Sequence, residues 1–494
     1  MLAAVAVLTA CGHKSDSGKK RDSGSAGPAV APLAMPAVGV DRVMRFRFIY
    51  GEGYSAYKGC AEKLKAKDFP AAVKACETAV DKDPTHLDAQ RGLAVALANT
   101  GEPAAAVDHL VAALAADYYA YAPTLGDPDL ESFRATPHGQ AVAQLAQKIH
   151  DEYVRRIKTG LLVLGRRAMF RWPDKSGPQY DPSRGELYAY DRETRRYFRL
   201  THTDHEVAAF VLAPSGSEVA LLGFDKVDYD KTGASPPLLA HSWVVTVDTG
   251  EWKTLGPQAS LPSSREVALG YAAGDKLLVS TAPATGRWTV GDATVSTVDR
   301  STGKLTKAGD AMPVPRVVLN LDEARVVHGV PGVEAAWSND PPTTTSMKLA
   351  TGQAISIPES GQASESTVAV SPDGAHVAFA TAVDPCAKDF APSLYVADAK
   401  SGTLKHVLTA RSRFATRWVD ANVLAYEDGE GSIRLWDATS GREAQRLENK
   451  AGLALDVLSL ANGPLCKQAP PEAGSGSSDE LPPEEGAGPV TAPP

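Results

Sequence analysis

The stretch that decides the fold is residues 366–409, which read STVAVSPDGAHVAFAT, a loop with Cys386, and then PSLYVADAKSGTLKHVLT. Apolar and small or polar side chains alternate on both sides of Pro372-Asp373-Gly374, as in a half-buried strand pair. Pro presets φ, Asp caps its own turn and Gly allows a positive φ, so this tripeptide is typical of a hairpin turn. A second hairpin follows, with its turn at 398–402. Because a four-stranded unit cannot bury both of its faces alone, the fold depends on whether the unit repeats.

The outer hairpin of this unit recurs between residues 160 and 461. Its copies start at Glu186, Ser242, Ala293, Ser346, Ser393 and Ser432. An aspartate heads the turn in all copies except the fourth, which has Ala350 there; these aspartates are Asp191, Asp248, Asp299, Asp398 and Asp437. An apolar inner strand pair precedes each copy, and the units are spaced by roughly 40–57 residues.

Six units of this kind predict a β-propeller with four strands in each blade. The SPDG-type turns, APSG at 213–216 and SPDG at 371–374, resemble the WD40-like repeats of TolB-type propellers, and SIRLWD at 432–437 is similar to a WD40 strand ending. The apolar segment 453–460 is expected either to complete the ring by pairing with the first blade or to begin a seventh blade. We favour six blades. This resemblance implies an architecture and no particular activity.

Residues 54–158 carry a helical pattern with an internal offset of 34 residues. The offset aligns Ala72 with Ala106, Cys76 with Leu110, Ala79 with Ala113 and Asp83 with Asp117. This is the period of tetratricopeptide repeats, and 71–84 and 105–117 resemble their second helices. Generic alanine-rich hairpins are the alternative. Residues 127–146 resemble the block that caps short arrays, and a final helix is expected from 141 to about 158.

The N-terminus resembles a bacterial lipoprotein signal: an apolar run at 2–8 leads into Leu8-Thr9-Ala10-Cys11. The resemblance implies that Cys11 carries lipid and anchors the chain without a spanning helix. Since no Lys or Arg precedes the apolar run, we expect the true start to lie upstream of Met1. By analogy with enterobacterial sorting, Gly12 favours the outer membrane. The alternative is a fortuitous apolar start with a free cysteine.

The four remaining cysteines are an even number, which suits an oxidising compartment. A helical hairpin that turns near Asp68 would bring Cys60 level with Cys76, so we predict a disulfide; two small buried apolar residues are the alternative. A bond between Cys386 and Cys466 is predicted to fix the end of the propeller, with free thiols as the alternative.

The predicted domains are a lipoprotein signal segment (1–11), a flexible tether (12–45), a tetratricopeptide-like helical domain (46–158), a propeller (159–463) and a disordered, acidic, proline-rich tail (464–494). The net charge is −8 and no basic stripe is present, which argues against nucleic acid as a partner. No run of about 18 apolar residues predicts a membrane-spanning helix.

The sequence has no G-x-S-x-G, no Walker A loop and no H-E-x-x-H, so no catalytic residue and no cofactor is predicted. The histidine-rich stretch 201–206 is interpreted as a solvated loop between blades, a metal site being the alternative. Asp225, Asp228 and Asp230 lack the order of a calcium loop, so no metal ligand is predicted.

These features together favour a non-enzymatic scaffold of the bacterial cell envelope, held on the membrane by lipid. Its expected partners are other envelope proteins or peptides, bound by the tetratricopeptide groove and the propeller rim. Two alternatives remain open: a propeller enzyme that cleaves glycan or peptide at the funnel, and a protein that binds cell-wall glycan.

Overall fold

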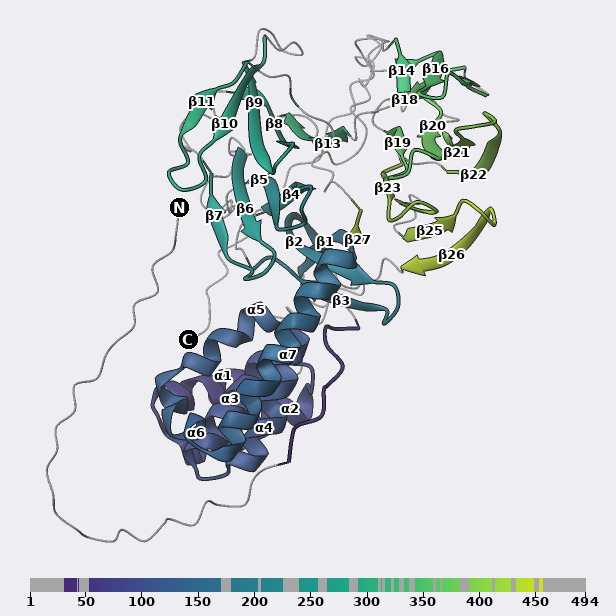
Figure 1. The fold of residues 1–494 in the computed structure, drawn as a ribbon. Helices are drawn as coiled ribbons and strands as arrows, with labels where there is room; N and C mark the ends of the chain where they lie inside the picture. The colour runs from purple at the N-terminus through teal and green to yellow at the C-terminus, as the bar shows by residue number, and fades with distance from the viewer. Residues whose placement is uncertain are drawn as a thin grey trace, which may run out of the picture.

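The structure is a computed structural model with a helical region followed by a β-rich region (Figure 1). It describes residues 31–41, 43, 53–169, 179–202, 206–224, 240–255, 264–283, 292–309, 312, 316–320, 324–327, 333–336, 343–358, 361–364, 367–382, 391–410, 414–427, 432–447 and 453–455.

The helical region consists of two antiparallel helix pairs followed by a shorter, irregular run and a long final helix. Its elements are α1 (Tyr54–Lys65), α2 (Phe69–Lys82), α3 (Leu87–Asn99), α4 (Pro103–Ala116), α5 (Tyr118–Tyr121), η2 (Ala122–Gly126), η3 (Pro128–Leu130), α6 (Glu131–Arg134) and α7 (Pro137–Thr159). The final helix begins four residues before the expected 141. Thr136 Oγ1 accepts a hydrogen bond from Gly139 N at 3.0 Å, and proline occupies the first turn, so the earlier start is capped.

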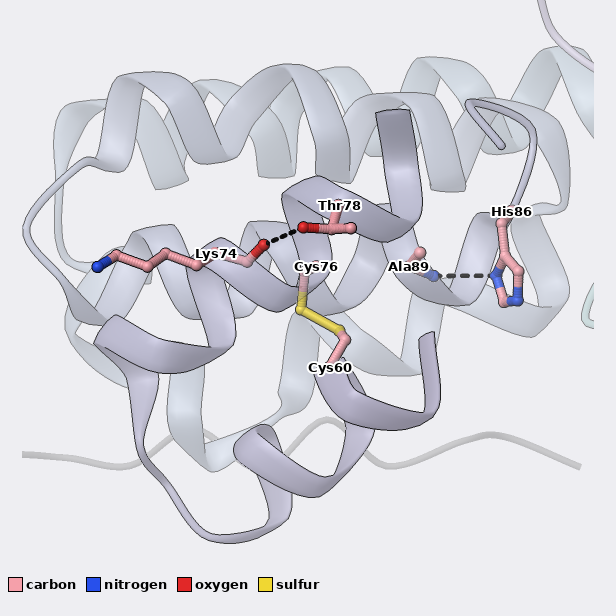
Figure 2. Close-up of a disulfide and its surroundings, with 6 residues drawn as sticks. All are labelled: Cys60, Lys74, Cys76, Thr78, His86 and Ala89. Atoms are coloured by element: carbon pink, nitrogen blue, oxygen red, sulfur yellow. Dashed lines mark hydrogen bonds between the residues drawn. A yellow bond between two sulfur atoms is a disulfide. The ribbon is translucent and has the colours of Figure 1, made fainter. Parts of the chain in front are cut away.

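A disulfide lies at the centre of the first helix pair. Cys60 of α1 and Cys76 of α2 are joined, with 2.02 Å between their Sγ atoms, and both residues are fully buried (Figure 2). Gly92 of α3 packs onto this bond, because a Cβ atom at that position would lie 3.0 Å from Cys60 Sγ. The predicted pairing is therefore part of the packed core between α1, α2 and α3.

The β-rich region is a succession of antiparallel sheets. Its strands are β1 (Leu161–Met169), β2 (Gln179–Asp191), β3 (Arg196–Arg199), β4 (Glu206–Leu212), β5 (Glu218–Phe224), β6 (Ala240–Thr246), β7 (Trp252–Thr254), β8 (Ser264–Ala272), β9 (Lys276–Pro283), β10 (Thr294–Val298), β11 (Leu305–Lys307), β12 (Arg316–Asn320), β13 (Ala324–Val327), β14 (Val333–Ala335), β15 (Thr343–Thr344), β16 (Ser346–Leu349), β17 (Ala354–Ser356), β18 (Ala363–Ser364), β19 (Ala369–Val370), β20 (His376–Ala380), β21 (Ser393–Asp398), β22 (Leu404–Thr409), β23 (Thr416–Trp418), β24 (Val423–Glu427), β25 (Ile433–Asp437), β26 (Arg442–Leu447) and β27 (Leu453–Ala454).

The repeated hairpins predicted from the sequence are confirmed. The deciding stretch forms the sheet β19-β20-β21-β22, and Gly374 in its first turn has a φ of +72°. Each of the six predicted outer hairpins is present, namely β2-β3, β6-β7, β10-β11, β16-β17, β21-β22 and β25-β26. Asp398 shows why an aspartate heads these turns: its Oδ1 accepts hydrogen bonds from the backbone N of Lys400 and Ser401.

The pairing differs in several places from a row of six separate four-stranded units. Among the described strands, the fourth outer hairpin has only β14 beside it, in the sheet β14-β16-β17, and β15 pairs with β18 in a two-stranded sheet. The first unit takes its inner strand from the far end of the chain, because β27 pairs with β1 in the sheet β27-β1-β2-β3. This pairing is the ring closure considered for 453–460. In addition, β12 pairs with the open inner edge of β8, which joins the third unit and β12-β13 in one six-stranded sheet. An inner strand has an unpaired backbone edge, so it can accept such a neighbour.

The prediction that residues 12–45 form a flexible tether is wrong at the C-terminal end of this range. Val38 and Val43 are only 7% and 4% exposed, and Val40 forms an antiparallel bridge with Tyr197 of β3. The serine-, glycine- and proline-rich composition concealed the apolar residues at these positions, which pack onto the folded regions. We call residues 33–43 the strap.

Candidate functional site

The inner face of the helical region is the first candidate site. Along α3, Asp88, Arg91, Val95 and Asn99 are spaced by three or four residues, so they lie on one side of the helix. The same face is flanked by α1 and by α5, the first helices of the preceding and the following units. This face is divided into a half that the chain itself covers and a half that it leaves accessible.

The covered half lies at the C-terminal end of α3. Asn99 Nδ2 donates a hydrogen bond to the carbonyl oxygen of Asp129 at 2.8 Å, and Lys67 Nζ lies 2.6 Å from Asp129 Oδ1. Leu130 beside them is buried in the same core as Val95. The segment between α5 and α7 therefore closes this end of the inner face, as the predicted capping block would.

The accessible half lies at the N-terminal end of α3. Asp88 is exposed, and its Oδ1 accepts a hydrogen bond from the Tyr121 hydroxyl at 3.0 Å. The Tyr57 ring lies against His86 in a tilted arrangement, with centroids 4.5 Å apart. His86 Nδ1 accepts the backbone N–H of Ala89 (Figure 2). Burial and the charge of Asp88 raise the pKa of both tyrosines. Both hydroxyls therefore remain protonated donors at neutral pH.

Arg91 is the cation of this accessible half. It is partly exposed and forms no hydrogen bond or ion pair with any residue that the structure describes. Its charge partly opposes the rise in the pKa of Tyr57. A guanidinium that has no partner among the described residues can bind a carboxylate or a peptide carbonyl.

The junction between the helical and β-rich regions is the second candidate site, and it is a buried ionic network. Asp117, at the end of α4, accepts Arg199 Nη1 at 3.4 Å and lies 2.7 Å from His202 Nε2. Arg199 also donates to Glu186 Oε1 at 3.0 Å. Burial alone would raise the pKa of Asp117, but His202 and Arg199 outweigh it, so the pKa lies below its ordinary value.

Aromatic rings surround this network. The Tyr153 hydroxyl of α7 donates to the carbonyl oxygen of Arg199 at 3.0 Å, and its ring meets Phe198 edge-on, with centroids 5.2 Å apart. The hydroxyl of Tyr119 donates to the carbonyl oxygen of Val247, in the turn after β6. One continuous apolar core includes side chains of the helices and of the first two sheets.

The end of α7 adds charged contacts at the rim of the junction. Arg156 Nη1 lies 2.8 Å from Asp191 Oδ2 and 2.9 Å from Glu193 Oε2, in the turn between β2 and β3. Lys158 Nζ lies 2.8 Å from Asp248 Oδ1, in the turn between β6 and β7. The helices are thus fixed to two neighbouring sheets, which argues for a rigid junction.

The structure describes only some of the site residues that the sequence singled out. Cys60 and Cys76 are brought together, whereas Cys11, Cys386 and Cys466, with the aspartates at 225–230, lie outside the described residues. The interpretation of 201–206 as a solvated loop is wrong for its first two residues: Thr201 is 1% exposed, and His202 binds Asp117. The junction was missed, although the alignment of Asp83 with Asp117 marks one of its members.

The comparisons with known proteins bear on the helical region first. Residues 63–120 match the tetratricopeptide repeat family model. The matched region covers the whole of α2, α3 and α4. No curated protein matches this chain.

Several solved structures are similar to the chain at low identity. They include the tricorn protease (13% identity, TM-score 0.34, covering 59% of this chain and 26% of that one) and the AtxE2 isopeptidase (13%, 0.34, 58% and 53%). A third is the putative TolB from Agrobacterium tumefaciens (10%, 0.30, 53% and 89%). The chain therefore spans about a quarter of the length of the tricorn protease and about half of that of the isopeptidase.

Within the described ranges, none of the helices combines the length and apolar character needed to cross a membrane. Those same ranges bring no three His, Cys, Asp or Glu side chains into an arrangement that could hold a metal ion.

Proposed function

We propose that this protein is a non-enzymatic binding scaffold of the bacterial cell envelope, held at a membrane by lipid on Cys11. The observation that carries the proposal is the accessible half of the tetratricopeptide inner face, where Arg91 has no partner among the described residues and Tyr121 donates to Asp88 on the same helix. Proteins with repeats of this kind bind peptides on such concave faces.

The shape of this face limits the partner. Since the segment around Asp129 covers the C-terminal half of α3, only a short peptide segment fits the remaining half. Arg91 favours an acidic side chain or a terminal carboxylate in that segment, and the half-buried Tyr57 ring of α1 favours an apolar residue. The partner is therefore a protein that presents a short acidic and apolar segment.

The rigid junction supports a scaffold with two binding surfaces. The tetratricopeptide face and the turns of the β-rich region are held at a fixed separation, because Asp117, Arg199 and Tyr153 connect them through buried contacts. Two weak sites on one rigid body bind a partner that spans both more tightly than either site does alone.

Co-purification from detergent-solubilised envelopes tests the binding role. The full-length protein should retain a specific partner, and Arg91→Glu should lose most of it, since the reversed charge repels an acidic segment. Lys58→Glu, an exposed change on α1 whose ammonium lies over Tyr54, is the matched control and should retain the partner. Equal recovery by all three proteins, or no partner with any of them, would count against the proposal.

The anchor has a test of its own. Cells that express the protein should incorporate a labelled fatty acid into it, and Cys11→Ala should abolish the label and release the protein from membranes. Labelling that survives this substitution would exclude the lipid anchor.

The two alternative functions make different predictions. An enzyme predicts that the purified full-length protein cleaves peptide or glycan. A glycan-binding protein predicts retention on purified peptidoglycan after Arg91→Glu.

A further inference from the structure

The strap lies on a surface formed by both folded regions. We call this surface, which includes Ala115 of α4 and Arg196 and Tyr197 of β3, the seat. Val38 lies in the core shared by the helices and the first two sheets, whereas Val43 lies in a separate core formed by the first and last sheets. Between them, Gly39 N donates to the carbonyl oxygen of Ala115 in α4 at 2.7 Å. The strap therefore crosses the junction, and Figure 1 shows it passing beside α4 toward β3.

The seat binds the backbone of the strap as well as its side chains. Val40 and Tyr197 exchange both of their backbone hydrogen bonds, at 2.9 Å and 2.7 Å, so the strap adds to the outer edge of β3. Arg196 donates from Nε to the carbonyl oxygen of Val38 at 2.8 Å and from Nη2 to that of Gly39. Contacts of this kind are those by which an extended peptide adds to a sheet edge.

The position of Gly39 restricts which segments can bind at the seat, because it accepts only glycine. Its φ is +81°, and a Cβ atom there would lie 2.7 Å from the carbonyl oxygen of Tyr197 and 2.9 Å from the Phe198 ring. Only glycine meets both conditions. A segment that fits this seat therefore has glycine between two apolar residues, as in Val38-Gly39-Val40.

The strap does not fill its seat. A cavity of about 230 Å³ remains beside Gly39, Val40 and Asp41, and its opposite walls come from Leu87 of α3, Ala112 of α4 and other residues of these helices. Val40 is only partly buried next to it. This pocket is half open to solvent, and a side chain larger than valine would gain contacts with its walls.

We propose that the edge of β3 with Arg196 is a binding site for an extended segment of a partner protein, and that the strap is an exchangeable occupant held there in cis. The partner segment has the pattern apolar–glycine–apolar, with a second apolar residue larger than valine that fills the cavity. Release of the strap uncovers the backbone N–H and carbonyl groups of Tyr197, which are the groups an incoming strand needs.

Peptide binding to the full-length chain tests this exchange. The probe is a labelled peptide of residues 31–43, and the variant is Val38→Asp, which puts a charge into the apolar core and so expels the strap. Fluorescence anisotropy should show saturable binding to Val38→Asp at least about tenfold tighter than to the wild-type chain, whose seat is occupied. Met35→Asp, at a residue that is 44% exposed, should behave as the wild type does.

Two altered peptides define the seat. A peptide with Val40→Phe should bind Val38→Asp more tightly than the unaltered peptide does, because the ring enters the cavity. A peptide with Gly39→Val should not bind. Equal binding to all three proteins, retained binding by the Gly39→Val peptide, or no saturable binding to a folded Val38→Asp chain would overturn the proposal.

Hydrogen exchange on the wild-type chain keeps the proposal testable if Val38→Asp does not fold. An exchangeable strap predicts that the amides of Gly39, Val40 and Tyr197 exchange together and faster than the amides of β1. Exchange of these amides as slowly as those of β1 would show that the strap never leaves on its own, which would overturn the proposal.

Discussion

Asp117 Oδ1 and His202 Nε2 lie 2.7 Å apart across the junction between the tetratricopeptide region and the first two sheets. Asp117 stands 34 residues after Asp83, at the same place in the repeat. Asp83 accepts local hydrogen bonds from Thr85, whereas Asp117 reaches another domain. The same repeat position therefore holds a local turn in the first copy, through Asp83, and connects two domains in the second copy, through Asp117.

Removing this carboxylate should weaken the whole protein. Asp117→Ala removes the carboxylate that both Arg199 and His202 contact at the junction, and breaking a buried charged pair costs roughly 3–5 kcal/mol. Urea unfolding should show a loss of this size. The control is Asp83→Ala at the equivalent position, whose loss of about 1 kcal/mol reflects a cap only. Similar losses in both variants would contradict a special role for the junction.

The junction should also weaken in acid. The pKa of Asp117 is lowered in the folded state, so its contribution is present above the unfolded pKa, about 4, and is lost as pH falls through the folded pKa. The free energy of unfolding should therefore fall more steeply below about pH 4 in the wild type than in Asp117→Asn. Parallel pH profiles for the two proteins would reject this assignment.

The pairing of Cys60 with Cys76 should be found in the protein isolated without reducing agent. Peptide mapping without reduction should recover the two cysteines in one cross-linked fragment, and alkylation of both as free thiols would refute it. Replacing both by alanine should cost roughly 2–4 kcal/mol, as expected for a closed loop of this length.

Gly92 offers a test of the packing around that disulfide. A Cβ atom at position 92 would lie 2.9 Å from Leu64 Cδ1 and 3.0 Å from Cys60 Sγ, so Gly92→Ala should cost about 1–3 kcal/mol despite the better helix propensity of alanine. Gly59→Ala on α1 is the matched control, since no atom lies near its added methyl, and it should stabilise slightly. Thermal unfolding of both variants distinguishes these outcomes.

Closure of the β-rich region depends on very few residues. Leu453 and Leu455 are buried, and Glu427 accepts the backbone N–H of Leu455. Truncation after residue 452 should therefore lower the thermal midpoint markedly, whereas truncation after 461 should leave it unchanged. Equal midpoints for both truncations would show that β27 contributes nothing.

The repeated elements could be predicted from the sequence because their signals are local. Turn residues such as Pro372-Asp373-Gly374 and the 34-residue offset act within one hairpin or one helix pair, so each copy can be recognised alone. The same holds for Cys60 and Cys76, whose hairpin is set by the turn near Asp68. Ring closure could be anticipated only as one of two possibilities.

The junction could not be predicted, because its partners are far apart in sequence and ordinary in type. Nothing in the neighbourhood of His202 or Arg199 indicates which surface they face, and burial of Thr201 depends on Glu186 of another strand. The strap was missed for a related reason: Val38 and Val43 are isolated apolar residues in a segment whose composition is typical of a linker.

The pairing of β27 with β1 has a consequence for how the chain folds during synthesis. Leu164 and Ala454 are partners across nearly three hundred residues, and contacts of such separation form late. The tetratricopeptide region has mostly local contacts and can form as soon as it emerges. The first sheet must wait, with the inner edge of β1 unpaired, until almost the whole polypeptide has been delivered.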